Sequence, residues 1–298
     1  MIEIKNITKK FEEKIALNNV DFNISKGSVY GLVGSNGSGK STLLRLISGV
    51  YTADSGSILI DGKEPFNNPA IKAGICYLAD SPYFIHQANI TEMARFYNSM
   101  YPSFSYQKFN ELSNIFPLDL KAKINTMSKG MQRQAALMLS LATQPKYLLL
   151  DEAFDGLDPV MRKVLKNLLT MGSENGMTTI IASHNLRDLD YLCDSVGLLH
   201  FGKIVFNDEI ENLKQKLHKV QLAFERVPDT SIFEQLDIVK TEKTGSLLNL
   251  VVRGNREEIM TFLKRLNPIF IEAIEPSFEE IFMYELEVRG YDAENIIK

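Results

Sequence analysis

The segment Gly34–Ser41 constrains the fold of this chain more than any other part of the sequence. It reads Gly-Ser-Asn-Gly-Ser-Gly-Lys-Ser and matches the pattern G-x-x-x-x-G-K-[ST] at every position. The run Ser28–Val33 before it is typical of a strand, and Ser41–Ile47 after it has the apolar spacing of a helix. A strand, a glycine turn and a helix in this order predict an α/β fold with a phosphate-binding turn.

The residue types in this turn suit the phosphates of a nucleotide. Glycines let backbone N–H groups approach phosphate oxygens without a Cβ in the way, and the following helix points its positive end at the same anion. Lys40 adds a charge for the outer phosphates, and the Ser41 hydroxyl is suited to ligate Mg²⁺. The alternative, a chance glycine-rich turn, is expected in roughly one chain of this length in a hundred. The predicted nucleotide-binding residues here are Ser35, Asn36, Gly37, Ser38, Gly39, Lys40, Ser41 and Thr42.

Two adjacent acids follow a second apolar strand, Tyr147–Leu150. An unpaired buried charge is costly, so Asp151 and Glu152 at this position indicate a site rather than packing. Beside a phosphate loop, Asp151 is expected to hold Mg²⁺ and Glu152 to act as general base on the attacking water. The alternative is a solvated strand end with no chemical role.

The remaining patterns divide the chain into a large and a small domain. Apolar runs alternate with helical patterns over 1–215, which predicts an α/β sheet interrupted by a mostly helical insert at about 88–143. From residue 216 to 298 we expect a small α+β domain, and Ser277 with Glu280 predicts a capping box at the start of its last helix. The expected strands are Ile2–Thr8, Val20–Ile24, Tyr147–Asp151, Thr178–Ser183, Val196–His200, Lys219–Glu225, Ile238–Glu242, Leu247–Arg253 and Ile269–Ile274. The expected helices are Ile90–Met100, Tyr106–Phe116, Met131–Thr143, 160–171, 186–193, Glu257–Leu266 and Phe278–Leu286.

Composition narrows the classes of partner. The chain has 298 residues, of which 45% are hydrophobic and 23% are charged, and its net charge is −4. An acidic balance argues against nucleic acid as a partner. No segment approaches the ~18 apolar residues that a membrane span needs, and the N-terminus lacks a signal-peptide pattern. If this protein serves a membrane, we expect it to do so by docking on another chain.

Three further segments complete a resemblance to a known family. Ser128–Gln132 (Ser-Lys-Gly-Met-Gln) resembles the signature segment of ATP-binding-cassette (ABC) ATPases, Phe154–Pro159 resembles their D-loop, and Ser183-His184 matches their switch histidine. The resemblance covers about residues 1–215. It implies a P-loop ABC ATPase domain with an antiparallel β subdomain, an α/β core and a helical subdomain, and it implies hydrolysis of ATP.

The resemblance also implies roles for further residues. In the family the signature segment faces the γ-phosphate bound to a second cassette, which implies a head-to-tail homodimer for this chain. Ser128, Gly130, Gln132 and Asp158 are then expected at the nucleotide of the partner cassette, His184 at the γ-phosphate and Phe11 against adenine. Taken singly, Ser128–Gly130 is more often an ordinary helix start, His184 a structural or surface histidine, and Phe11 a core residue.

Two positions depart from the family pattern. Asp80 stands where the family has a glutamine that approaches Mg²⁺ and the attacking water, and we expect it to serve as an altered metal ligand. Lys129 replaces the more usual glycine of the signature. Both departures bear on the rate of turnover more than on ATP binding.

The tail of the chain suggests which kind of ABC protein this is. Glu275–Met283 resembles the ending of exporter ATPases that pair with ABC-2-like membrane subunits, and Tyr77–Tyr83 resembles the GntR-linked exporters, among them those of phenol-soluble modulins. This implies an ATPase at the cytoplasmic face of the cell membrane that powers export, with amphipathic toxins or antimicrobial peptides as possible cargo. The alternatives are a soluble ABC ATPase of translation or DNA repair and an ATP-driven dimerisation switch that Asp80 would favour.

Overall fold

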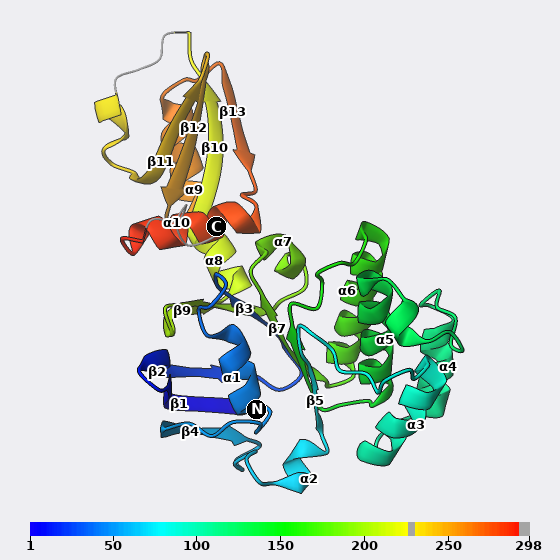
Figure 1. Ribbon diagram of the computed structural model, residues 1–298. Coiled ribbons are helices and arrows are strands. Elements are labelled where there is room, and N and C mark those ends of the chain that lie inside the picture. The colour runs from blue at the N-terminus through cyan, green and yellow to red at the C-terminus, as the bar shows by residue number, and fades with distance from the viewer. Residues whose placement is uncertain (226–229, 292–298) are drawn as a thin grey trace. The chain divides into compact units, whose positions relative to one another are not determined.

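The chain forms two compact units in the computed structural model, which describes residues 1–225 and 230–291 (Figure 1). The units are residues 1–207 and 208–298, so the boundary lies at 207 rather than at the predicted 215. The reason is helix α8 (Ile210–Lys216), which contacts strand β10 (Leu217–Ala223) and helix α10 (Phe278–Val288) of the second unit. The last seven residues of the predicted C-terminal domain, 292–298, lie outside the described residues.

An antiparallel sheet opens the first unit, as the fold class predicted. Its strand order is β2-β1-β4, with β1 at Ile2–Phe11, β2 at Lys14–Ile24 and β4 at Ser55–Ile60. Both predicted N-terminal strands are longer than expected, because Phe11 and Lys14 are paired across a two-residue turn and the ladder continues to the hairpin end. Strand β4 was not predicted from the sequence.

A six-stranded sheet of order β5-β6-β7-β3-β8-β9 forms the centre of this unit. The pairs of β3 with β7 and β8, and of β6 with β5 and β7, are parallel, so these five strands end at one edge. Open α/β sheets bind ligands at the carboxyl ends of such strands. The strands are β3 (Val29–Val33), β5 (Ile75–Leu78), β6 (Tyr147–Asp151), β7 (Thr178–Ser183), β8 (Ser195–His200) and β9 (Lys203–Glu209).

Helix α1 (Lys40–Ile47) fixes the phosphate loop to the core of the first unit. Its apolar face, Leu43, Leu44, Leu46 and Ile47, is buried in one cluster with side chains of both sheets. Burial of each such side chain contributes about 1.5–3 kcal/mol. The core therefore anchors helix α1, and the helix fixes the position of the phosphate loop at its N-terminus.

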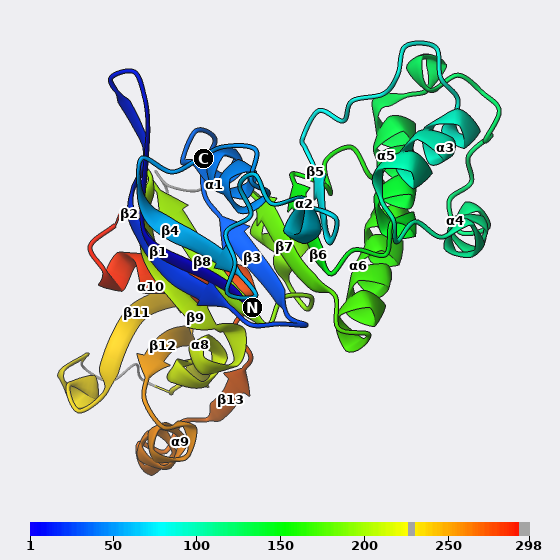
Figure 2. The same cartoon turned by 90° about the horizontal axis from the view of Figure 1, so that it is seen from below.

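The helical insert lies beside the β5 edge of the sheet (Figure 2). A capping box of Asn89 and Glu92 starts its first helix, as its hydrogen bonds show. The helix predicted at 186–193 is shorter in the structure, where only Leu186–Leu189 is helical. The backbone leaves the helical conformation at Asp190, which has φ −60° and ψ 138°. Tyr191 then adopts φ 58°, a left-handed conformation that does not continue a helix. The helices are α2 (Pro69–Lys72), α3 (Ile90–Met100), α4 (Tyr106–Ser113), the 3₁₀ turn Ile124–Thr126, α5 (Lys129–Ala142), α6 (Pro159–Glu174) and α7 (Leu186–Leu189).

The second unit is an α+β domain with its own core. Its four strands are antiparallel in the order β11-β12-β10-β13, and Val220, Leu250, Ile259 and Leu263 are among the side chains buried between sheet and helix. The predicted capping box is confirmed, since the Ser277 backbone N–H donates to the Glu280 carboxylate and the Glu280 N–H donates to the Ser277 hydroxyl. The remaining elements are the 3₁₀ turn Thr230–Phe233, β11 (Asp237–Thr244), β12 (Leu247–Arg253), α9 (Arg256–Arg265) and β13 (Phe270–Ile274).

None of the helices that the structure describes is long and apolar enough to span a lipid bilayer.

Candidate active site

A cavity of about 300 Å³ lies where the carboxyl ends of the parallel strands meet the phosphate loop. It brings together residues that the sequence places far apart, among them Phe11, Asp80 and Glu152. Most of the predicted loop residues also line it, which places the phosphate loop next to the carboxylates of Asp80 and Glu152. Its lining is Phe11, Lys14, Ala16, Asn36, Gly37, Gly39, Lys40, Ser41, Thr42, Asp80 and Glu152.

The glycines of the loop are required by their surroundings. A Cβ on Gly34 would lie 2.3 Å from the Leu199 carbonyl oxygen. A Cβ on Gly39 would lie 2.6 Å from the Ala16 carbonyl oxygen, and Gly39 also has φ 112°. Ser38 is nearly buried and does not line the cavity, so any nucleotide contact it makes must use its backbone.

Lys40 folds back over the loop. Its side chain is 5% exposed, and Nζ donates to the carbonyl oxygens of Gly34 at 2.7 Å and Ser35 at 3.2 Å. The same ammonium lies 3.2 Å from Glu152 Oε1. The cation is therefore held inside the cavity by three oxygens, at the place where the outer phosphates of a nucleotide need a positive charge.

Asp151 offers a buried oxygen that is suited to a divalent cation. The residue is 1% exposed; its Oδ2 accepts from the Tyr77 hydroxyl at 3.1 Å, while Oδ1 has no partner among the described residues. Burial raises the pKa of this carboxyl, and hydrogen bonds from Ser41 and Tyr77 oppose the rise. A buried carboxylate oxygen without a partner, beside the Ser41 hydroxyl, is the donor set that Mg²⁺ prefers, so these two residues fit the metal.

Glu152 and His184 form the second half of the acidic site. The carboxylate Oε2 accepts from His184 Nδ1 at 2.9 Å and from the His184 backbone N–H at 3.3 Å. Because a carboxylate can only accept, Nδ1 carries the proton and Nε2 is the nitrogen left for a ligand. Glu152 itself has φ 49°, a strained conformation that is common at functional sites. Asp155, which the sequence analysis did not single out, offers an oxygen within 4.8 Å of both groups.

The signature residues lie outside the cavity of their own chain. Ser128 caps α5, with its hydroxyl accepting from Met131 N–H at 3.2 Å. Gln132 Nε2 donates to the Ile124 and Met127 carbonyl oxygens, both at 3.1 Å, and Asp158 caps α6. None of Ser128, Gly130, Gln132 and Asp158 is among the residues lining the described cavity. Their role at a partner's nucleotide stays a prediction.

Asp80 and Phe11 both line the cavity, and Asp80 has a partner there that was not expected. Asp80 lines the cavity, but its Oδ1 accepts from Arg133 Nη2 at 3.0 Å, a partner that nothing in the local sequence indicated. Phe11 is 42% exposed, which excludes the alternative of an ordinary core residue, and its ring meets Tyr51 edge-on at 5.5 Å. An exposed aromatic ring at the cavity rim is free to stack on a base.

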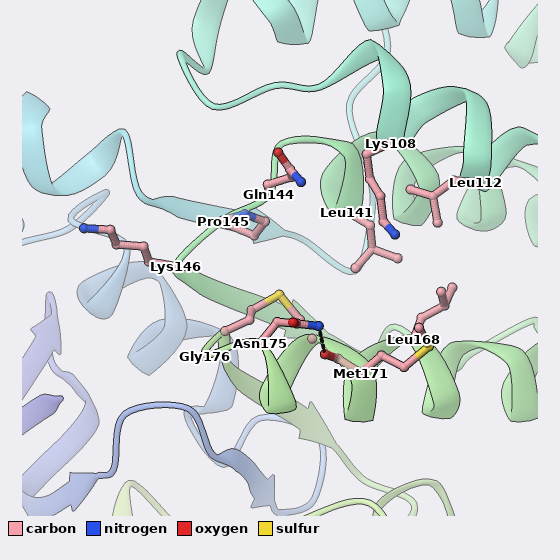
Figure 3. Close-up of a pocket in the computed structure, with 12 residues that line it drawn as sticks. Lys108, Leu112, Leu141, Gln144, Pro145, Lys146, Leu168, Met171, Asn175 and Gly176 are labelled. Carbon is pink, nitrogen blue, oxygen red and sulfur yellow. Dashed lines mark hydrogen bonds between the residues drawn. The ribbon is translucent and has the colours of Figure 1, made fainter.

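A second cavity, of about 440 Å³, lies between α4, α5 and α6 and is drawn in Figure 3. Its lining combines Leu141, Leu168 and Met171 with two lysines and contains no carboxylate. It therefore lacks the groups that could hold a metal or activate water, and the chemistry belongs to the smaller cavity at the phosphate loop.

The sequence profile of the family described as "ABC transporter" matches residues 17–155. The chain is also 32% identical to the ABC transporter ATP-binding protein YtrB of Bacillus subtilis (strain 168), and the match covers 95% of this chain and 97% of that protein. The chain is an ABC transporter ATP-binding protein. As a member of this family it is an ATPase that binds and hydrolyses ATP.

Two further relatives are named for different cargoes. This ABC ATPase is 32% identical to the lantibiotic transport ATP-binding protein SrtF of Streptococcus pyogenes, over 76% of this chain and 99% of that one. It is equally identical to the methionine import ATP-binding protein MetN of Clostridium acetobutylicum, over 72% of this chain and 70% of that one.

Solved structures agree with the fold. An ATP-binding subunit of an ABC transporter superposes with a TM-score of 0.67, at 24% identity, over 72% of this chain and 92% of that chain. The cassette MJ0796, whose structure is described as dimeric in a post-hydrolysis state bound to ADP and Pi, superposes with a TM-score of 0.63, at 24% identity, over 70% of this chain and 98% of that chain.

Proposed function

We propose that this ABC ATPase powers the export of amphipathic peptides through a separate membrane subunit, at the cytoplasmic face of the cell membrane. The observation that carries the proposal is the separation of Ser128 and Gly130 from the cavity that Lys40 and Glu152 line. One chain then holds only part of a working site, and energy release is tied to assembly. The lantibiotic transport function named for SrtF supports a peptide cargo.

Two copies of the chain complete two sites. The signature helix α5 begins with a serine hydroxyl and free backbone N–H groups, which are ready partners for a phosphate. Because these groups lie away from their own phosphate loop, a head-to-tail homodimer brings them to the nucleotide of the other copy. The dimeric form of the MJ0796 cassette supports this arrangement.

The residues of the cavity divide the chemistry. Lys40 binds the outer phosphate oxygens, and Ser41 with Asp151 would hold Mg²⁺, which neutralises phosphate charge when bound. Glu152 accepts a proton from the attacking water, and His184, fixed through its hydrogen bond to Glu152, contacts the terminal phosphate. Phe11 stacks on the adenine.

The proposal is tested by measuring ATP-dependent dimerisation and transport of a peptide. The Glu152→Gln variant should bind ATP without hydrolysing it and should elute as a dimer in ATP and as a monomer in ADP. With the membrane subunit that co-purifies, inside-out vesicles should take up an amphipathic peptide when ATP is added outside. A variant that stays monomeric in ATP contradicts the head-to-tail homodimer.

Import is the second candidate, because the methionine importer ATPase is as similar to this chain as the lantibiotic one. An importer would release a preloaded solute from inside-out vesicles and would leave peptide outside. A dimerisation switch would show the ATP-dependent dimer, yet no membrane subunit would co-purify and no transport would follow.

A further inference from the structure

Arg133 of the signature helix holds two consecutive residues of the loop that follows β5. Its Nη1 donates to the Ala79 carbonyl oxygen at 3.2 Å, and its Nη2 donates to Asp80 Oδ1 at 3.0 Å. Arg133 lies on α5, one residue beyond Gln132, which ties the segment before the signature to the same helix. One guanidinium therefore joins the helix that starts at Ser128 to the loop that carries Asp80.

The loop that Arg133 holds is also connected to the metal-binding residues. Tyr77 lies near the end of β5, three residues before Asp80. Its hydroxyl donates a hydrogen bond to Asp151. Asp80 lines the nucleotide cavity together with Lys40, Ser41 and Glu152. This short segment thus contacts the catalytic cavity on one side and the signature helix on the other.

The burial and the charge of Arg133 explain why Asp80 pairs with it. The Arg133 side chain is 9% exposed and that of Asp80 is 59% exposed. A guanidinium is always charged, so a nearly buried one needs acceptors, and those it has here are Asp80 and the Ala79 carbonyl. Without the Asp80 carboxylate, the nearly buried Arg133 cation would be left with one neutral acceptor, the Ala79 carbonyl oxygen.

We propose that Arg133 is a positioning residue that clasps the Asp80 loop to the signature helix, and that Asp80 acts through this clasp rather than as a ligand of Mg²⁺. The inference rests on the proposed function, because it matters only where the signature helix must reach a second nucleotide. It offers an alternative to the sequence-based expectation of a metal role for Asp80, which stays a prediction.

The first test measures the clasp without nucleotide, by hydrogen–deuterium exchange in the full-length protein. Arg133→Gln and Asp80→Asn should each raise the exchange rate of amides 80–86 at least threefold, and the charge-reversed pair Asp80→Arg with Arg133→Asp should bring it back toward the wild-type rate. Arg95→Gln is the matched control, since it removes an exposed arginine from helix α3 of the same insert. Asp80→Asn changes an exposed side chain, so the test does not depend on the more buried Arg133 variant folding.

The second test measures the metal directly. Electron paramagnetic resonance of Mn²⁺ with ATP should give an unchanged metal affinity, within twofold, in Asp80→Asn and at least a tenfold loss in Asp151→Asn. A loss in Asp80→Asn as large as that in Asp151→Asn would overturn the clasp, and so would unchanged exchange in both single variants. If Glu152→Gln stayed monomeric while the exchange results held, the proposed function would fail and the clasp would stand.

Discussion

The ammonium of Lys40 and the carboxylate of Glu152 form an ion pair inside the nucleotide cavity, with Nζ 3.2 Å from Oε1 and side chains only 5% and 12% exposed. The phosphate-loop cation and the proposed general base thus stabilise each other. Binding of ATP phosphates would draw Lys40 toward a new anion, and Glu152 would then be left for the attacking water and His184.

The pair predicts a stability coupling in protein free of nucleotide. Lys40→Met leaves the Glu152 carboxylate without its cation in a nearly buried place, and breaking such a pair costs about 3 kcal/mol. Lys40→Met combined with Glu152→Gln removes both charges and should recover most of the loss. Denaturant unfolding of the wild type, both single variants and the double variant measures the coupling; additive effects would show that the two charges do not interact.

Replacing Asp151 with asparagine should stabilise the fold and abolish ATP hydrolysis. Burial disfavours the charged form of this carboxyl and raises its pKa, so Asp151→Asn should raise the free energy of unfolding by about 1 kcal/mol and Tm by about 3 °C at pH 7. Mg²⁺-dependent hydrolysis should be lost. An acid with a raised pKa in the folded state destabilises the fold above that pKa, so the advantage of asparagine should vanish as pH falls below the ordinary value of 3.8.

Thermal unfolding of both proteins from pH 3 to pH 8 checks this prediction. An advantage of the asparagine variant that grew toward low pH would contradict the assigned cause.

Gly130 should be required for assembly and not for nucleotide binding. A Cβ at this position would lie 2.6 Å from the Gly156 carbonyl oxygen, so Gly130→Ala must displace the start of the signature helix or the D-loop. ATP hydrolysis should fall at least tenfold, while the affinity of the monomer for a fluorescent ATP analogue should change less than twofold. Gly74→Ala is the matched control, because its Cβ would meet nothing closer than 3.5 Å.

Phe11 should report adenine directly. The chain contains no tryptophan, so Phe11→Trp creates a single tryptophan at the rim of the cavity, which can be excited apart from the tyrosines. Its emission should be quenched by ATP and not by inorganic triphosphate. Phe11→Ala should weaken ATP binding about tenfold, which corresponds to about 1.4 kcal/mol of lost stacking. Equal quenching by ATP and triphosphate would show that the ring does not contact the base.

The sequence predicted those parts of the site that neighbouring residues encode. The loop Gly34–Ser41 follows a strand and starts a helix as expected, and Asp151 ends a buried strand that Glu152 follows. The capping box of Ser277 is likewise a local pattern. In each case the residues that make the structure stand within a few positions of one another, so their spacing is sufficient evidence.

Local sequence patterns predicted the structure less well where an element ends or where its formation depends on residues that are distant in the sequence. Strand β4 was not predicted because its short run, Ser55–Ile60, is only partly buried. Its pairing with β1 depends on residues that are distant in the sequence. The helix predicted over 186–193 ends at Leu189 because the backbone becomes extended at Asp190 and left-handed at Tyr191. The unit boundary moved to 207 because α8 contacts elements that follow it in the chain.

By itself, the sequence of this chain determined the family, the phosphate loop, the acid pair and the class of fold, because each depends on residue types at fixed short spacings. Only the tertiary structure decided that Asp80 pairs with Arg133, because the two residues stand 53 positions apart and the pairing follows from two elements meeting in space. The same holds for Lys40 and Glu152. Charges that are distant in sequence find their partners only when the strands and helices that carry them are packed together.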